Sequence, residues 1–89
     1  MKNWKIEVKP TAEKYYLKLD KKARTRVKEA LRELETVDAP LLHPNVRALT
    51  GKLQGDFRLR VGKWRILFTP YIGKKTIYVF AIVPRGGAY

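Results

Sequence analysis

Hydrophobic and charged residues alternate near the start of the chain, over Asn3 to Val8. Such alternation is typical of a strand with one buried face, here formed by Trp4, Ile6 and Val8. Pro10 ends this pattern, and Thr11 stands where the N-cap of a following helix is expected. The first helix is therefore predicted over about Ala12 to Leu19.

A second helix is predicted directly after the first. Asp20 is its candidate N-cap. Behind Asp20, apolar residues recur at helical spacing and predict the buried stripe of an amphipathic helix: Ala23, Val27, Ala30, Leu31 and Leu34. Asp38 and Pro40 end the pattern. Because the two helices abut at Asp20, we expect them to form a helical hairpin.

The period of a strand returns in the second half of the chain. Val46 to Leu49 fits a short strand, and a longer alternation from Asp56 to Thr69 is interrupted only by Gly62-Lys63. A two-residue loop that begins with glycine suits a tight hairpin. After a looser turn over Pro70 to Lys75, the nearly all-apolar run Thr76 to Val83 predicts an interior strand buried on both faces.

The predicted order of elements is one strand, two helices, and then three or four strands. Helices grouped before an antiparallel meander of strands favour an α+β fold, in which the helical hairpin packs on one face of a single sheet and leaves the other face free. A chain of 89 residues suffices for one hydrophobic core but not for two. Residues 1–89 are therefore expected to form a single domain.

The loop at Gly62-Lys63 also predicts which side chains of the hairpin share a face. It sets Arg60 opposite Arg65, with Arg58 beside them, and turns six apolar side chains toward the helices: Phe57, Leu59, Val61, Trp64, Ile66 and Phe68. Directly opposed like charges disfavour a sheet by a few tenths to about 1 kcal/mol. A bound anion would reverse that sign, because guanidinium groups suit phosphate oxygens. The alternative is that the arginines simply lie over a solvated sheet.

The charge of the chain is large and unevenly distributed. The formal net charge is +12. Residues 1–44 hold 11 lysines and arginines against 7 acids, whereas residues 45–89 hold 9 against Asp56 alone. A surplus of this kind implies a polyanionic partner or an acidic protein that covers it. Solubility alone, the alternative explanation, requires no such asymmetry.

Several kinds of chemistry are excluded by composition. The chain has no cysteine, so disulfides, thiol nucleophiles and zinc–thiolate sites are ruled out. The single histidine, His43, lies beside Pro44 and is interpreted as a plain surface residue; no metal site and no cofactor are expected. The longest apolar stretch, Ile77 to Val83, is too short to span a bilayer. Charges interrupt Met1 to Pro10, so no signal peptide is expected and the cytoplasm is the simplest location.

Three segments of the second half form a recognisable signature. The first two read Leu49-Thr50-Gly51-Lys52-Leu53 and Phe57-Arg58-Leu59-Arg60-Val61-Gly62-Lys63-Trp64-Arg65-Ile66-Leu67-Phe68, and the chain ends Ile82-Val83-Pro84-Arg85-Gly86-Gly87-Ala88-Tyr89. This pattern resembles the RelE/ParE toxin superfamily, in which a leucine–glycine loop precedes an arginine-rich hairpin and a closing strand is followed by arginine and tyrosine. The resemblance covers the whole chain in the order of elements, and residues 49–89 in motif detail.

The resemblance implies a toxin of a type II toxin–antitoxin pair. The RelE branch of the superfamily cleaves messenger RNA in the ribosomal A site, and the ParE branch inhibits DNA gyrase. The implied function is a ribosome-dependent mRNA endoribonuclease that inhibits translation, with the ribosome, mRNA and an acidic RelB-like antitoxin as partners. A gyrase inhibitor without enzymatic activity and a non-toxic nucleic-acid-binding module remain alternatives.

The resemblance also implies site residues by position. Arg65 matches the hairpin arginine that holds the scissile phosphate, Arg85 the second essential arginine, and Tyr89 the C-terminal tyrosine. Lys52 and the Tyr89 phenol are candidate proton carriers. The candidate RNA-binding residues are Arg58, Arg60, Lys63 and Arg47.

One departure from the family pattern bears on the reaction, which would be attack of the RNA 2′-hydroxyl on the adjacent phosphate. Arg58 and Arg60 stand where the best-known RelE ribonuclease has two lysines. A lysine can lose its proton and act as a base, whereas an arginine effectively cannot. Catalysis is therefore expected to rest on orientation and on stabilisation of charge.

Overall fold

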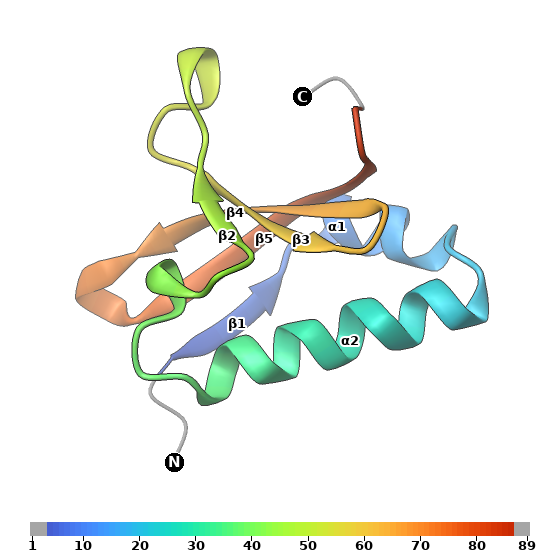
Figure 1. The fold of residues 1–89 in the computed structure, drawn as a ribbon, viewed down its shortest axis with the longest axis horizontal. Coiled ribbons are helices and arrows are strands. Elements are labelled where there is room, and N and C mark those ends of the chain that lie inside the picture. Colours follow the sequence, from blue (N-terminus) through green and yellow to red (C-terminus); the bar gives the residue numbers. More distant parts are fainter. Residues whose placement is uncertain (1–3, 87–89) are drawn as a thin grey trace.

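A computed structural model describes residues 4–86 and shows two helices and one five-stranded sheet (Figure 1). The helices are α1 (Pro10–Leu17) and α2 (Lys21–Thr36), and the strands are β1 (Lys5–Val8), β2 (Val46–Ala48), β3 (Phe57–Val61), β4 (Trp64–Tyr71) and β5 (Thr76–Pro84). The strand order is β1-β5-β4-β3-β2. Strand β1 pairs in parallel with β5, whereas β2, β3, β4 and β5 form an antiparallel meander. The predicted α+β class and element order are confirmed.

The first helix begins earlier than the sequence pattern predicted. Pro10 is its first residue and Lys9 occupies the N-cap position, so the prediction of Thr11 as N-cap was wrong. Proline suits this position because its φ is already helical and the first N–H of a helix has no intrahelical partner. The Thr11 hydroxyl instead donates a hydrogen bond to the carbonyl of Phe80, at 3.2 Å, and ties α1 to β5.

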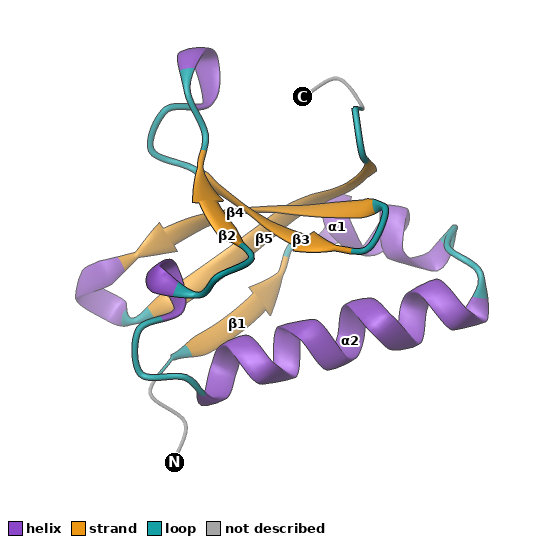
Figure 2. Ribbon diagram, in the orientation of Figure 1, coloured by secondary structure: helices purple, strands orange, loops and turns teal. Residues whose placement is uncertain are grey.

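The second helix begins as predicted. The Asp20 carboxylate accepts a hydrogen bond from the backbone N–H of Ala23, at 2.8 Å. The predicted stripe faces the core: Ala23, Val27 and Leu34 are buried, and Ala30 and Leu31 pack against the same cluster. α2 lies across one face of the sheet, while α1 runs beside β5 (Figure 2).

The β3–β4 hairpin has the predicted register. All five pairs agree, from Val61 opposite Trp64 to Phe57 opposite Phe68. The expected turn at Pro70 was placed too early, because β4 continues to Tyr71 and Pro70 pairs with Ile77. Strand β3 reaches only as far as Phe68, so Pro70 lies where β4 has a single neighbour and a missing N–H is tolerated.

A β-bulge in β5 produces a second, smaller core on the far side of the sheet. Leu67 pairs with Ala81 while Phe68 pairs with Val79, so Phe80 is the extra residue. The bulge reverses the alternation of β5. The apolar cluster on the far side consists of Leu67, Ala81 and Val83, with Leu49 and Phe80 packed against it. β5 is therefore buried on both faces, as predicted, but the face away from α2 is not bare.

Among residues 4–86, no helix combines the length and the apolar character that crossing a membrane requires.

Candidate nucleic-acid interface

Four arginines occupy the sheet surface that faces away from α2, and we call this surface the arginine face: Arg47, Arg58, Arg60 and Arg65. The register sets Arg60 opposite Arg65, as predicted, and also sets Arg47 opposite Arg58. Both are like-charge pairs across neighbouring strands, and each disfavours the sheet by a few tenths to about 1 kcal/mol. The face therefore carries two unfavourable pairs in the absence of a ligand.

The guanidinium of Arg65 is anchored at the β3–β4 turn. Its Nη1 donates hydrogen bonds to the carbonyls of Gly62, at 3.0 Å, and Trp64, at 2.9 Å. Gly62 has a φ of 58°, in the left-handed region that glycine adopts without strain. The tight turn thus supplies the acceptors that hold Arg65.

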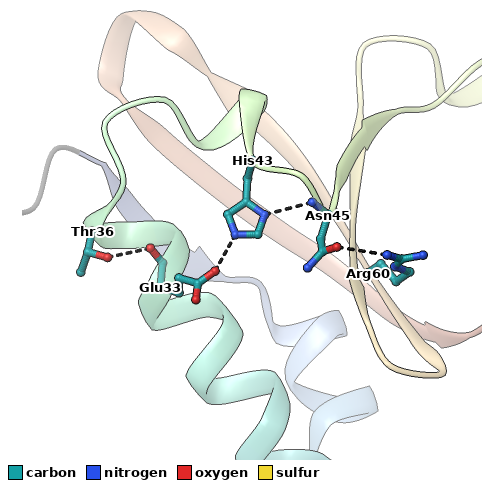
Figure 3. A network of polar contacts seen from close by, with 5 residues as sticks. All are labelled: Glu33, Thr36, His43, Asn45 and Arg60. Carbon is teal, nitrogen blue, oxygen red and sulfur yellow. Dashed lines mark hydrogen bonds and ion pairs between the residues drawn. The ribbon is translucent and has the colours of Figure 1, made fainter.

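Arg60 is anchored on the other side by a chain of polar contacts that begins on α2 (Figure 3). Its Nη2 donates to the side-chain oxygen of Asn45, at 3.3 Å, and its backbone N–H donates to the Asn45 carbonyl, at 2.9 Å. The backbone N–H of Asn45 donates to Nδ1 of His43, at 3.1 Å, and Nε2 of His43 lies 2.5 Å from Glu33. Because Nδ1 is an acceptor here, the neutral ring carries its hydrogen on Nε2 and donates it to Glu33.

This series of hydrogen bonds shows that the interpretation of His43 as a plain surface residue was wrong. Its side chain is only 12% exposed and links α2 to the arginine face. Asn45 was not singled out from the sequence at all. The only signal was indirect: a histidine and an asparagine flank Pro44 in a segment that breaks the helix pattern.

Two segments rise from the sheet on the side of the arginine face (Figure 1). One is the loop between β2 and β3, in which exposed Lys52 lies on a single helical turn, Gly51–Leu53. The other follows β5, where the backbone N–H of Arg85 donates to the carbonyl of Lys63, at 2.7 Å. That bond sets Arg85 at the same end of the sheet as Arg65. The arginine face therefore lies between two raised segments that each carry a predicted site residue.

Of the two remaining predicted residues, Lys63 does not join this group. The ammonium of Lys63 lies 5.9 Å from the centre of the Trp64 ring, and Trp64 packs toward the helices. Lys63 thus sits at the rim of the turn, beside Arg26 and Asp20 of the helical side. Tyr89 lies outside the described residues.

The acidic groups near the arginine face are too few to neutralise it. Asp56, the one acid of residues 45–89, accepts a hydrogen bond from the Thr69 hydroxyl at 2.7 Å. Within residues 4–86, no three histidine, aspartate or glutamate side chains come close enough to hold a metal ion. The described part of the site can bind phosphate and stabilise added negative charge. Its arginines cannot accept a proton.

Comparison with solved structures shows what this architecture resembles. No profile of a known protein family matches the chain, and no curated protein does. A chain of the archaeal RelE–RelB complex from Pyrococcus horikoshii is 25% identical, with a TM-score of 0.76 over 96% of this chain and 98% of that one. The chain has the RelE-like toxin fold.

Two further structures share the RelE-like fold at lower identity. A chain of the intact E. coli RelBE toxin–antitoxin complex is 20% identical, with a TM-score of 0.68 over 91% of this chain and 95% of that one. The YoeB/ParE toxin from Agrobacterium tumefaciens is 13% identical, with a TM-score of 0.73 over 91% of this chain and 98% of that one. At such identities the likeness establishes the backbone arrangement and leaves the site to be argued from this chain's own residues.

Proposed function

We propose that this protein is the toxin of a type II toxin–antitoxin pair, and that it inhibits translation by cleaving messenger RNA on the ribosome. The observation that carries the proposal is the arginine face. Two opposed arginine pairs are kept on the side of a RelE-like sheet that faces away from α2, although directly opposed like charges disfavour a sheet. A polyanion bound between the raised segments would turn this cost into a gain.

The likeness to toxins in complex with antitoxins supports the partner. The matched complexes are RelE–RelB and RelBE. An acidic, RelB-like antitoxin fits this chain because the net charge of +12 calls for an acidic cover.

The proposed reaction is attack of an RNA 2′-hydroxyl on the adjacent phosphorus. The new bond joins the 2′-oxygen to phosphorus, and the bond to the 5′-oxygen breaks, which leaves a 2′,3′-cyclic phosphate and a 5′-hydroxyl. Arg65 and Arg85, held at one end of the sheet, would stabilise the charge that builds on the phosphate. One well-placed donor is worth about 3–4 kcal/mol in such a transition state.

The reaction also requires transfer of a proton from the 2′-hydroxyl and of a proton to the leaving 5′-oxygen. Tyr89 and Lys52 are the proposed carriers, since Arg58 and Arg60, which stand where the best-known RelE ribonuclease has two lysines, cannot accept a proton. Alignment of the 2′-hydroxyl with the leaving oxygen can contribute about 7–11 kcal/mol. A ribosome that fixes the codon would supply this alignment, which explains how a site without an evident base could work.

Induction in growing cells tests the proposal. Expression of the wild type should stop protein synthesis and produce new mRNA 5′ ends within codons, and Arg65→Ala should do neither. DNA damage with continuing translation would indicate a gyrase inhibitor instead. Normal growth of cells that accumulate the soluble wild-type protein without an antitoxin would indicate a non-toxic binding module.

A further inference from the structure

The sheet surface that bears the arginines continues to the opposite end of β4 and β5, where it carries two tyrosines. Tyr71 lies on the same side of β4 as Arg65, because residues two apart in a strand point the same way. Tyr78 of β5 stands opposite Thr69, and its ring meets that of Tyr71 edge-on, with 4.9 Å between centroids and 76° between planes. The two rings therefore share this face.

Two lysines from other elements converge on these rings. The ammonium of Lys9, which follows β1, lies 5.6 Å from the centre of the Tyr78 ring. The ammonium of Lys74, in the turn after β4, lies 6.0 Å from the centre of the Tyr71 ring. Tyr71 nevertheless remains 50% exposed. If the two rings only stabilised the sheet, burial of Tyr71 would stabilise it more than the observed half-exposed position does.

Two carboxylates lie near these rings, and each has a polar partner. Asp56 accepts a hydrogen bond, at 2.7 Å, from the hydroxyl of Thr69, which stands opposite Tyr78. Glu7 pairs with Tyr78 across β1 and β5, and its carboxylate lies 3.0 Å from the ammonium of Lys5. The four groups Lys9, Tyr78, Tyr71 and Lys74 thus form a cationic, partly exposed aromatic cluster.

We propose that this cluster is a second RNA subsite, which stacks an unpaired base and holds a neighbouring phosphate. The inference rests on the proposed function, because the RNA is the one held at the arginine face. Aromatic rings interleaved with cations are the means by which proteins bind single-stranded nucleic acid without sequence preference. The ligand class is therefore unpaired RNA flanking the cleaved position.

The separation of the two sites makes the inference testable. Tyr71 lies six positions after Arg65 along β4, or about 20 Å at the rise of a strand. A dinucleotide held at the arginine face does not cover this span, whereas an unpaired strand of about ten nucleotides covers it. Loss of the cluster should therefore weaken binding of the long RNA alone.

The experiment measures the Kd of two 2′-O-methyl RNAs, which cannot be cleaved, at one ionic strength: a dinucleotide and an unpaired decamer. Tyr71→Ala should weaken decamer binding about 5- to 150-fold, the equivalent of one lost stacked base, and leave dinucleotide binding unchanged. Tyr71→Phe keeps the ring and should bind both as the wild type does. Tyr15→Ala is the matched control, since Tyr15 is 45% exposed and lies between Lys14 and Lys18 on α1.

Lys74→Ala repeats the test without altering the ring pair, because this side chain is exposed. Decamer binding that survives both Tyr71→Ala and Lys74→Ala would overturn the inference, as would an equal loss for the two RNAs. If Arg65→Ala weakens both RNAs while Tyr71→Ala weakens neither, the second subsite fails and the proposed function stands. If the wild type binds neither RNA, the second subsite fails, and the proposed function is then decided by cleavage on the ribosome.

Discussion

Each arginine of the central pair is held by a different set of oxygen atoms. Arg60 donates to Asn45, on the β2 side, and Arg65 donates to the carbonyls of Gly62 and Trp64 at the turn. Hydrogen bonds to a charged group are worth about 1.5–3 kcal/mol when fully formed, and less at an exposed site. These anchors offset the repulsion between the two guanidinium groups, so the pair persists before any ligand binds.

Removal of the arginines proposed to bind phosphate should abolish the proposed activity and spare the fold. Arg65→Ala and Arg85→Ala are expected to eliminate growth arrest while changing the stability by less than about 1 kcal/mol. For Arg65, relief of the opposed pair offsets the lost hydrogen bonds. Arg85 is exposed, and its hydrogen bond to Lys63 is made by the backbone, which the substitution keeps. Growth after induction and thermal unfolding of the purified variants measure the two effects. Arg32→Ala, on the exposed side of α2, is the charge-matched control and should remain toxic.

A large fall in melting temperature for Arg65→Ala would place that side chain in the scaffold instead of the site. Retained toxicity with Arg85→Ala would remove Arg85 from the proposed chemistry.

Asn45 should act on RNA only through Arg60. In a double-mutant cycle, Asn45→Ala is expected to weaken RNA binding in the wild-type background and to have no effect in the Arg60→Ala background. The coupling energy should be at least about 0.5 kcal/mol, as for residues that share a hydrogen-bond network. Additive effects of the two substitutions would show that Asn45 does not position Arg60.

At the scale of elements, the hairpin and helix α2 could be predicted because their signals are local. Gly62-Lys63 sets the register of β3 and β4, and Asp20 marks where α2 begins. The bulge at Phe80 had no such signal, since every residue from Ile77 to Val83 is apolar and the pattern looks the same in either register. The order of residues in β5 therefore could not predict that the bulge reverses which side chains face α2.

The sequence predicted the arginines of the candidate site but not the residues that hold them in place. Arg60 and Arg65 follow from strand alternation, which is a property of the hairpin alone. The contact of His43 with Glu33 depends on how the chain turns back on α2 after Pro40, a tertiary arrangement that no local pattern encodes. The sequence therefore predicted Arg60 and Arg65 but not the hydrogen-bonding groups that support Arg60.

Helix α2 should lose stability when its cap is removed. Asp20→Ala is expected to lower the free energy of unfolding by about 1 kcal/mol, because the Ala23 N–H then loses its side-chain acceptor. Asp20→Asn keeps an acceptor oxygen and should stay within a few tenths of a kcal/mol of the wild type. Chemical denaturation of both variants checks the difference. Equal stability of Asp20→Ala and the wild type would contradict the capping role.

For the molecule as a whole, the arginine face and an apolar groove lie on different sides of the sheet. The groove, about 340 Å³ in volume, runs between α1, α2 and β5 and is lined mainly by Val8, Tyr16, Leu31, Val79 and Ile82. The arginine face lies on the other side of the sheet. A partner that covers both must be a flexible chain that wraps the domain.

Binding of the antitoxin should therefore have an ionic part and an apolar part. The co-expressed product of an adjacent reading frame is expected to bind with an affinity that falls as salt rises but persists at about 1 M, where charges are screened within about 3 Å. Val8→Asp, in the groove, should remove the salt-resistant part. Calorimetric titration across salt concentrations measures both. Binding that vanishes at high salt in the wild type would contradict an apolar contribution.

The proposed function is cleavage, at the arginine face, of mRNA that the ribosome positions. It is tested most directly by the cleavage rate of one message, naked and in a stalled ribosome with an empty A site, at matched ionic strength. We expect rapid cleavage on the ribosome by the wild type, little on naked RNA, and none in either setting by Arg65→Ala. Equal rates in the two settings would contradict the account, because they would require a self-sufficient base; Tyr89→Phe and Lys52→Ala would then be the substitutions that locate it.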